Sequence, residues 1–144
     1  MYKRILVATD GSELSAKAVQ AAVSMARLTG GALQALSVKE PFPFSAISEM
    51  QPVPPQDFYN TQEELAAAHV QGAVSAAQAA GLSCQGFTVE AVHPWEAILD
   101  HATTQGCDLI VMASHGRRGL SALLLGSETQ KVVTHGEIPV LVVR

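Results

Sequence analysis

The hydrophobic residues of this chain form short continuous runs that alternate with helical stripes. Continuous apolar runs predict strands at residues 5–8, 108–113 and 139–143. A strand that is apolar on both faces is typical of a parallel sheet covered by helices on both sides. Two further strands are predicted at residues 32–38 and 83–92, the second from a weaker alternation.

Apolar residues three and four positions apart predict helices between these strands. The helices are expected at residues 13–28, about 57–80, 94–105 and about 127–135. Ser12 suits the N-cap of the first helix and Gly30 its end, while Pro94 suits the first turn of the third. Alternating strands and helices predict a doubly wound α/β fold, a five-stranded parallel sheet with helices on both faces and right-handed crossovers. We expect one domain over residues 1–144, because the sequence has no repeat or linker.

One segment fits no regular element. Residues 40–56 carry five prolines, which exclude a helix or a central strand there: Pro41, Pro43, Pro52, Pro54 and Pro55. Loops of this length in compact domains tend to be functional or disordered. Two interpretations stay open, a lid over a ligand with Phe42, Phe44 or Met50 in contact, and a surface excursion without a role.

Composition narrows the range of partners. The chain is 48% hydrophobic and 15% charged, with a net charge of −4. An acidic balance argues against sequence-independent binding to nucleic acid, so no nucleic-acid partner is expected. The two cysteines show no metal-ligand spacing and are interpreted as small buried residues. No apolar run is long enough for a membrane span or a signal peptide, so we expect no membrane partner and a cytoplasmic location.

Candidate chemistry lies where the strands end. In open parallel sheets, ligands bind beyond the carboxyl ends of the strands. Thr9 and Asp10 follow the first strand, and Val38 ends the second. The fourth strand leads into a segment with glycines at 116 and 119, where positive φ would allow close approach to a ligand.

The start of the last helix is a candidate cradle for phosphate. Gly126 and Ser127 open this helix, whose free amides and partial positive charge favour an anion. Ser127 could cap the helix or donate its hydroxyl to phosphate, and Arg117 and Arg118 add cationic donors. A glycine-rich turn with an ordinary helix cap explains the same residues equally well. The sequence has neither a P-loop nor a GxGxxG turn, and His115 is interpreted as a loop histidine bonded to a carbonyl rather than a catalytic base.

These motifs together resemble the universal stress protein family. Its ATP-binding branch has a glycine, two residues, a second glycine, nine residues, then glycine with serine or threonine. Here the pattern spans Ala113 to Ser127, and the opening strand with its Asp10-Gly11-Ser12 turn matches as well. The resemblance covers the whole chain and implies an adenine nucleotide alpha hydrolase-like fold. Alanine replaces the first glycine, which would weaken binding if that position requires positive φ or more room.

The resemblance also implies roles for individual residues. Ala8, Thr9 and Val38 would line the adenine side, and Asp10 would contact the ribose or a Mg²⁺ ion. The ribose and α-phosphate would be wrapped by a segment of five residues: Met112, Ala113, Ser114, His115 and Gly116. The outer phosphates would bind Gly126, Ser127 and Glu128 through backbone amides and the Ser127 hydroxyl. The expected ligand is ATP, with ADP and AMP as alternatives.

The C-terminal segment from Ile138 to Val143 is expected at a sheet edge. An exposed apolar edge favours pairing with a second copy, so a homodimer is predicted, as in the family it resembles. Three functions stay open. The first is a nucleotide-responsive binding module without efficient catalysis. The second is a slow ATPase or self-phosphorylating protein, with Ser121 or Ser127 as acceptor. The third is a nucleotide-free interaction protein, which Ala113 favours.

Overall fold

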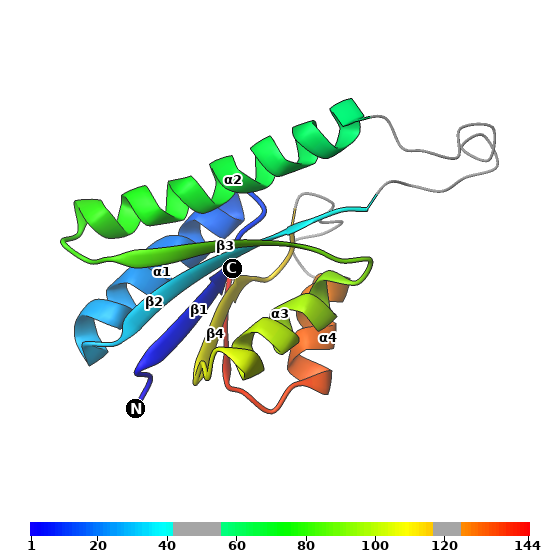
Figure 1. The fold of residues 1–144 in the computed structure, drawn as a ribbon. Coiled ribbons are helices and arrows are strands. Elements are labelled where there is room, and N and C mark those ends of the chain that lie inside the picture. Colours follow the sequence, from blue (N-terminus) through cyan, green and yellow to red (C-terminus); the bar gives the residue numbers. More distant parts are fainter. Residues whose placement is uncertain (42–55, 117–124) are drawn as a thin grey trace.

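The structure, a computed structural model, describes residues 1–41, 56–116 and 125–144. These residues form an α/β fold whose elements alternate along the chain (Figure 1). In order they are β1 Arg4–Ala8, α1 Glu13–Thr29, β2 Ala32–Lys39, α2 Gln56–Ala79, β3 Cys84–Glu90, α3 Pro94–Thr104, β4 Leu109–Ala113, α4 Ser127–His135 and β5 Val140–Val143. The predicted order is confirmed. β3 ends earlier than predicted because its last paired residue, Glu90, lies beside Lys39 at the end of β2.

The described strands make one parallel sheet in the order β3-β2-β1-β4-β5. β1 lies at the centre, with Val7 beside Ala35 of β2 and beside Val111 of β4. The chain adds β2 and β3 on one side of β1 and then crosses over to add β4 and β5 on the other. The direction therefore reverses between β1 and β4, which is the topological switch point of a doubly wound sheet.

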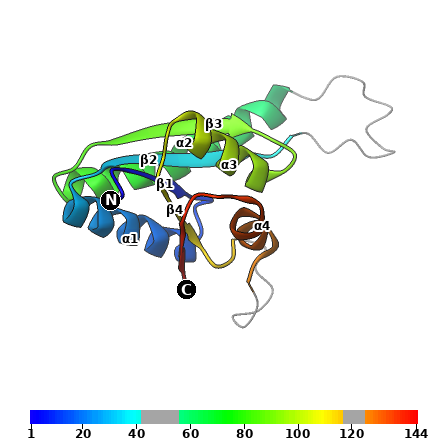
Figure 2. The same ribbon diagram turned by 90° about the horizontal axis from the view of Figure 1, so that it is seen from below.

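Each face of the sheet has its own core. Ile5, Val7 and Val111 pack against apolar residues of α1 and α2 on one face. Leu6 and Ile110, which alternate with them, pack with α3 and α4 on the other. The ribbon views show the two helical layers on either side of the sheet (Figures 1 and 2). Continuous apolar strands are thus explained, because both faces of the central strands are buried.

Local contacts fix the two ends of α1 and the start of β1. The Ser12 side chain accepts from the Ser15 amide at 3.1 Å and caps α1. Gly30, with φ of 68°, ends α1 in the left-handed conformation that glycine adopts without strain. The Asp108 carboxylate accepts from the backbone amides of Lys3 and Arg4, at 2.8 and 3.0 Å, and so holds the start of β1 beside β4.

None of the helices in the described part of the chain combines the length and the apolar character needed to span a bilayer.

Candidate functional site

The carboxyl ends of β1, β2 and β4 lie side by side at the switch point. β1 ends at Ala8, paired with Leu36 of β2, and β4 ends at Ala113. Ala8 and Val38 are partly buried and pack against the core below α3, and Met112 is buried there. The residues predicted to form the floor of a site are therefore together at one edge of the sheet.

The turn after β1 is held by its own hydrogen bonds. The Thr9 amide donates to the Leu36 carbonyl at 3.0 Å, and the Thr9 and Ser15 hydroxyls lie 3.2 Å apart. Asp10 Oδ1 accepts from the Ser12 amide at 3.0 Å. Gly11 has φ of 77°, so the turn requires glycine at that position. The Asp10 carboxylate is consequently fixed above the end of β1.

The segment after β4 is tied to two neighbours. The Ser114 amide donates to the Val143 carbonyl at 2.7 Å, and the Ser114 carbonyl accepts from the Gly126 amide at 2.6 Å. His115 Nδ1 donates to the Gly116 carbonyl at 3.3 Å, which matches its interpretation as a loop histidine. The backbone of this segment thus connects β4 and β5 with the start of α4. The expectation that the Gly126 amide donates to an outer phosphate is wrong for this structure, because that amide donates to the Ser114 carbonyl.

The two described glycines of the pattern are needed for space. A Cβ on Gly116 would lie 2.4 Å from Asp10 Oδ2, and one on Gly126 would lie 3.0 Å from both the Ser114 oxygen and the His115 Cα. The prediction of positive φ at Gly116 is wrong, because its φ lies outside that region. Glycine is therefore needed at 116 because the Asp10 side chain occupies the space, and at 126 because the 114–115 backbone does. Gly119 lies outside the described residues.

The structure also changes the interpretation of Ala113, a position for which positive φ or a need for more room was considered. It is a strand residue paired with Val143 and 7% exposed, and its side chain joins the core beneath α1. It is not among the described residues with positive φ. The conformational cost considered for alanine therefore does not arise, because the peptide has ordinary strand geometry. Its effect on affinity stays a prediction.

The start of α4 also corrects one expectation. Gly126 is the N-cap, with φ of −60° and ψ of 148°, and Ser127 is the first helical residue, so Ser127 does not cap the helix. The first-turn amides of α4 have no partner within the helix. Two contacts at this helix start are not evident from the sequence. Thr129 Oγ1 donates to the Ala113 carbonyl at 2.8 Å, and Glu128 Oε2 accepts from the Trp95 amide at 2.9 Å.

Arg117 and Arg118 lie outside the described residues, as do Ser121 and all of the predicted lid after Pro41.

A charged pair stands where β2 ends. Lys39 Nζ lies 2.5 Å from Glu63 Oε2 of α2, and Thr88 Oγ1 donates to the other oxygen of Glu63 at 3.5 Å. The hydrogen bond and the charge of Lys39 lower the pKa of Glu63.

No group of three or more potential metal ligands gathers within the described ranges.

The chain as a whole was compared with known protein families. The model of the universal stress protein family matches residues 1–144. The chain belongs to that family. Universal stress protein YxiE of Bacillus subtilis is 34% identical over 148 residues, covering 100% of both chains.

Solved structures of the family agree with the fold. MJ0577 of Methanocaldococcus jannaschii superposes with a TM-score of 0.83 at 29% identity, over 99% of this chain and 96% of that one. A universal stress protein solved in complex with cAMP has a TM-score of 0.73 and 27% identity, over 99% of this chain and 97% of its own. The α/β architecture expected from the sequence pattern is confirmed.

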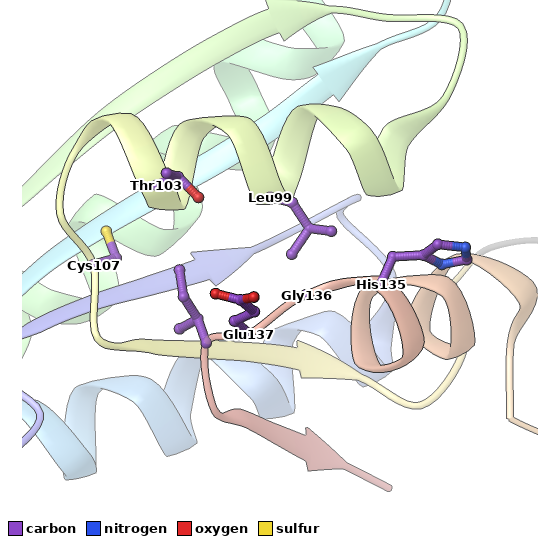
Figure 3. A pocket seen from close by; sticks show the side chains of 7 residues that line it. Leu99, Thr103, Cys107, His135, Gly136 and Glu137 are labelled. Atoms are coloured by element: carbon purple, nitrogen blue, oxygen red, sulfur yellow. The ribbon is translucent and has the colours of Figure 1, made fainter.

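The structure of this protein also has a cavity of about 460 Å³, away from the candidate site. Figure 3 shows it between the C-terminal halves of α3 and α4, where Leu99 and Glu137 point toward it. Cys107 and Ile138, which precede β4 and β5, also line it. It therefore opens at the amino ends of the strands, on the opposite side from the predicted site. We place the candidate site at the carboxyl edge, because the switch point and the glycine contacts lie there.

Proposed function

We propose that this protein binds an adenine nucleotide at the carboxyl edge of β1, β2 and β4. The observation that carries the proposal is the close approach of three segments: the turn after β1 with its Asp10 carboxylate, the 114–116 backbone and the start of α4. Gly116 leaves only enough room for the Asp10 carboxylate, and Gly126 leaves only enough for the 114–115 backbone. This close approach brings the Asp10 carboxylate, the 114–116 backbone and the start of α4 to one small region, and a carboxylate beside a helix N-terminus suits the ribose and phosphate of a nucleotide.

The site residues keep the roles that the family resemblance implies. Ala8, Thr9 and Val38 would border the base. Asp10 would accept from a ribose hydroxyl or hold Mg²⁺ together with phosphate oxygens, as Mg²⁺ usually combines one or two carboxylates with phosphates.

The phosphate end of the ligand would meet backbone donors. The ribose and first phosphate would lie along a five-residue stretch: Met112, Ala113, Ser114, His115 and Gly116. Further phosphates would extend toward the amides of Ser127 and Glu128 at the start of α4, where Gly126 contributes close approach and its amide stays bonded to the Ser114 carbonyl. Two observations support this proposal: family membership over residues 1–144 and a 27% identical relative solved with cAMP. ATP, ADP and AMP are all candidates for this protein.

Calorimetric titration with AMP, ADP and ATP, with and without Mg²⁺, tests the proposal. We expect micromolar to millimolar dissociation constants for at least one nucleotide. Gly116→Ala should weaken binding about tenfold, since its new Cβ displaces Asp10, and tenfold corresponds to about 1.4 kcal/mol. The matched control is Gly72→Ala, because a Cβ at Gly72 meets nothing within 4 Å. Absence of heat at millimolar concentrations of all three nucleotides would refute the function.

We further propose that binding occurs without efficient turnover. Among the described residues of the site, His115 is turned toward its own loop by the bond from Nδ1 to the Gly116 carbonyl, and Asp10 holds the turn after β1 through the Ser12 amide. A general base for water needs a proton-accepting atom within reach of the substrate. Phosphate release from ATP at a rate above that of a Ser127→Ala or Asp10→Ala variant would contradict this and favour the slow ATPase.

A homodimer through β5 completes the proposal. β5 pairs with β4 on one side and is an edge strand of the described sheet, and all four of its residues, Val140–Val143, are half-buried. Pairing with a second copy would cover this apolar edge. Light scattering at micromolar concentration should give twice the chain mass, and a monomer would count against the interface.

A further inference from the structure

Two helix N-termini meet at the carboxyl edge of the sheet. α3 begins at Pro94 and α4 at Ser127, and each helix starts where a preceding strand has ended. The first turn of a helix carries unpaired amides and about half a positive charge. Two such ends side by side form a natural position for an anion.

The protein fills that position with its own carboxylate. Glu128 is the second residue of α4, and its Oε2 accepts from the Trp95 amide in the first turn of α3 at 2.9 Å. The N-cap of α3, His93, makes no side-chain cap bond, and Pro94 has no amide hydrogen to donate. Glu128 therefore caps α3 from the neighbouring helix. A charge-assisted bond of this kind keeps the carboxylate in place.

We propose that Glu128 makes the nucleotide site selective for few phosphates, so that it favours a nucleoside monophosphate or cyclic monophosphate over a triphosphate. This inference rests on the proposed function. A first phosphate along residues 113–116 needs no donor from α4. Outer phosphates would extend to the first turn of α4, where the Gly126 amide already bonds the Ser114 carbonyl and a fixed negative charge stands one residue beyond Ser127.

Charge repulsion by Glu128 should lower the affinity for a triphosphate relative to a monophosphate. A triphosphate brings two phosphates more than a monophosphate into the region, where Glu128 already balances the partial positive charges of the two helix ends. Two like charges several ångströms apart near a protein surface repel appreciably, and salt weakens that repulsion. Replacing Glu128 by glutamine keeps an oxygen acceptor for the Trp95 amide but removes the charge.

The experiment measures the affinities of AMP, cAMP and ATP by calorimetry at low salt without Mg²⁺, so that the phosphate charge is not neutralised. The wild-type protein should bind AMP or cAMP at least as tightly as ATP. Glu128→Gln should tighten ATP binding by about two- to fivefold, a range typical of one charge at a helix N-terminus, and change AMP binding less. The matched control is Glu137→Gln, which removes one exposed carboxylate beyond the other end of α4.

A salt titration of the wild-type protein provides a second measurement that needs no variant. Raising the salt should improve ATP binding relative to AMP, because the repulsion is screened. The inference is overturned if the ATP-to-AMP affinity ratio is unchanged in folded Glu128→Gln, or if salt lowers that ratio in the wild type. These results are distinct from failure of the proposed function, in which no nucleotide binds at all and both proposals fall together.

Discussion

Gly126→Ala is a direct test of the geometry that brings the candidate site together. A Cβ at this position would lie 3.0 Å from the Ser114 oxygen and 3.0 Å from the His115 Cα, and both are backbone atoms that cannot swing aside. The backbone conformation itself, φ of −60° and ψ of 148°, is open to alanine. The perturbation is therefore a contact, without dihedral strain.

Three contributions set the change in the free energy of unfolding of Gly126→Ala. Alanine at an N-cap is about 0.5–1 kcal/mol less favourable than glycine. Pushing α4 away weakens the 2.6 Å bond between the Gly126 amide and the Ser114 carbonyl, which costs about 0.5–1.5 kcal/mol. In the opposite direction, alanine lowers the entropy of the unfolded chain and stabilises by about 0.4–1 kcal/mol. The net expectation is a loss of about 1 kcal/mol in the free energy of unfolding, or roughly 3–4 °C in Tm for a domain of this size.

The assay is urea denaturation followed by circular dichroism, with Gly72→Ala as the matched glycine replacement. Gly72 lies inside α2, exposed and with open space at its Cβ position, so alanine there should stabilise by about 0.8–1 kcal/mol. The two substitutions should thus have opposite signs. If Gly126→Ala is as stable as the wild type, the close approach of α4 to the 114–116 segment is refuted.

Three further predictions concern core contacts and pKa shifts. Gly86→Ala should lower the free energy of unfolding by about 1–3 kcal/mol, since its Cβ would lie 2.2 Å from Val70 Cγ1, and adding Val70→Ala should recover part of the loss in denaturant titrations. Burial alone raises the pKa of Asp108, but the backbone amides it accepts from outweigh this and hold that pKa below its usual value. The ionised carboxylate should therefore stabilise the fold above about pH 4, and this contribution should be lost as the pH falls through the lowered pKa. In Asp108→Asn the free energy of unfolding should fall less steeply at acid pH than in the wild type, and an equally steep fall would contradict this. Burial raises the pKa of Cys84 to about 11, so at pH 8 iodoacetamide should label it roughly a hundredfold more slowly than free cysteine, and rapid labelling of folded protein would show the thiol to be open.

Much of the fold was predictable from local patterns. Continuous apolar runs at residues 5–8 and 109–113 require burial on both faces, and a parallel sheet covered by helices provides it. Ser12 and Gly30 mark the ends of α1 through contacts with residues three or four positions away, so their roles are encoded nearby. The position of Val140–Val143 at an edge followed from the order of the elements.

The candidate site was predictable in its location and less so in its contacts. The sequence places Asp10, Gly116 and Gly126 after strands that end at one edge, and the structure brings all three together there. The physical role of the glycines differs from the prediction. Gly116 was expected to need positive φ, but the constraint is the Asp10 carboxylate, more than a hundred positions earlier in the chain.

The sequence alone determined the elements, their order and the edge at which polar residues gather, because these depend on hydrophobic period and on contacts within one turn. Only the tertiary structure decided that Ala113 faces the core, that Gly126 approaches the Ser114 backbone, and that Glu128 caps α3 at Trp95. These contacts depend on strand register and on how closely two helices approach. Those distances are set by the packing of the whole sheet, and no local pattern in the chain records them.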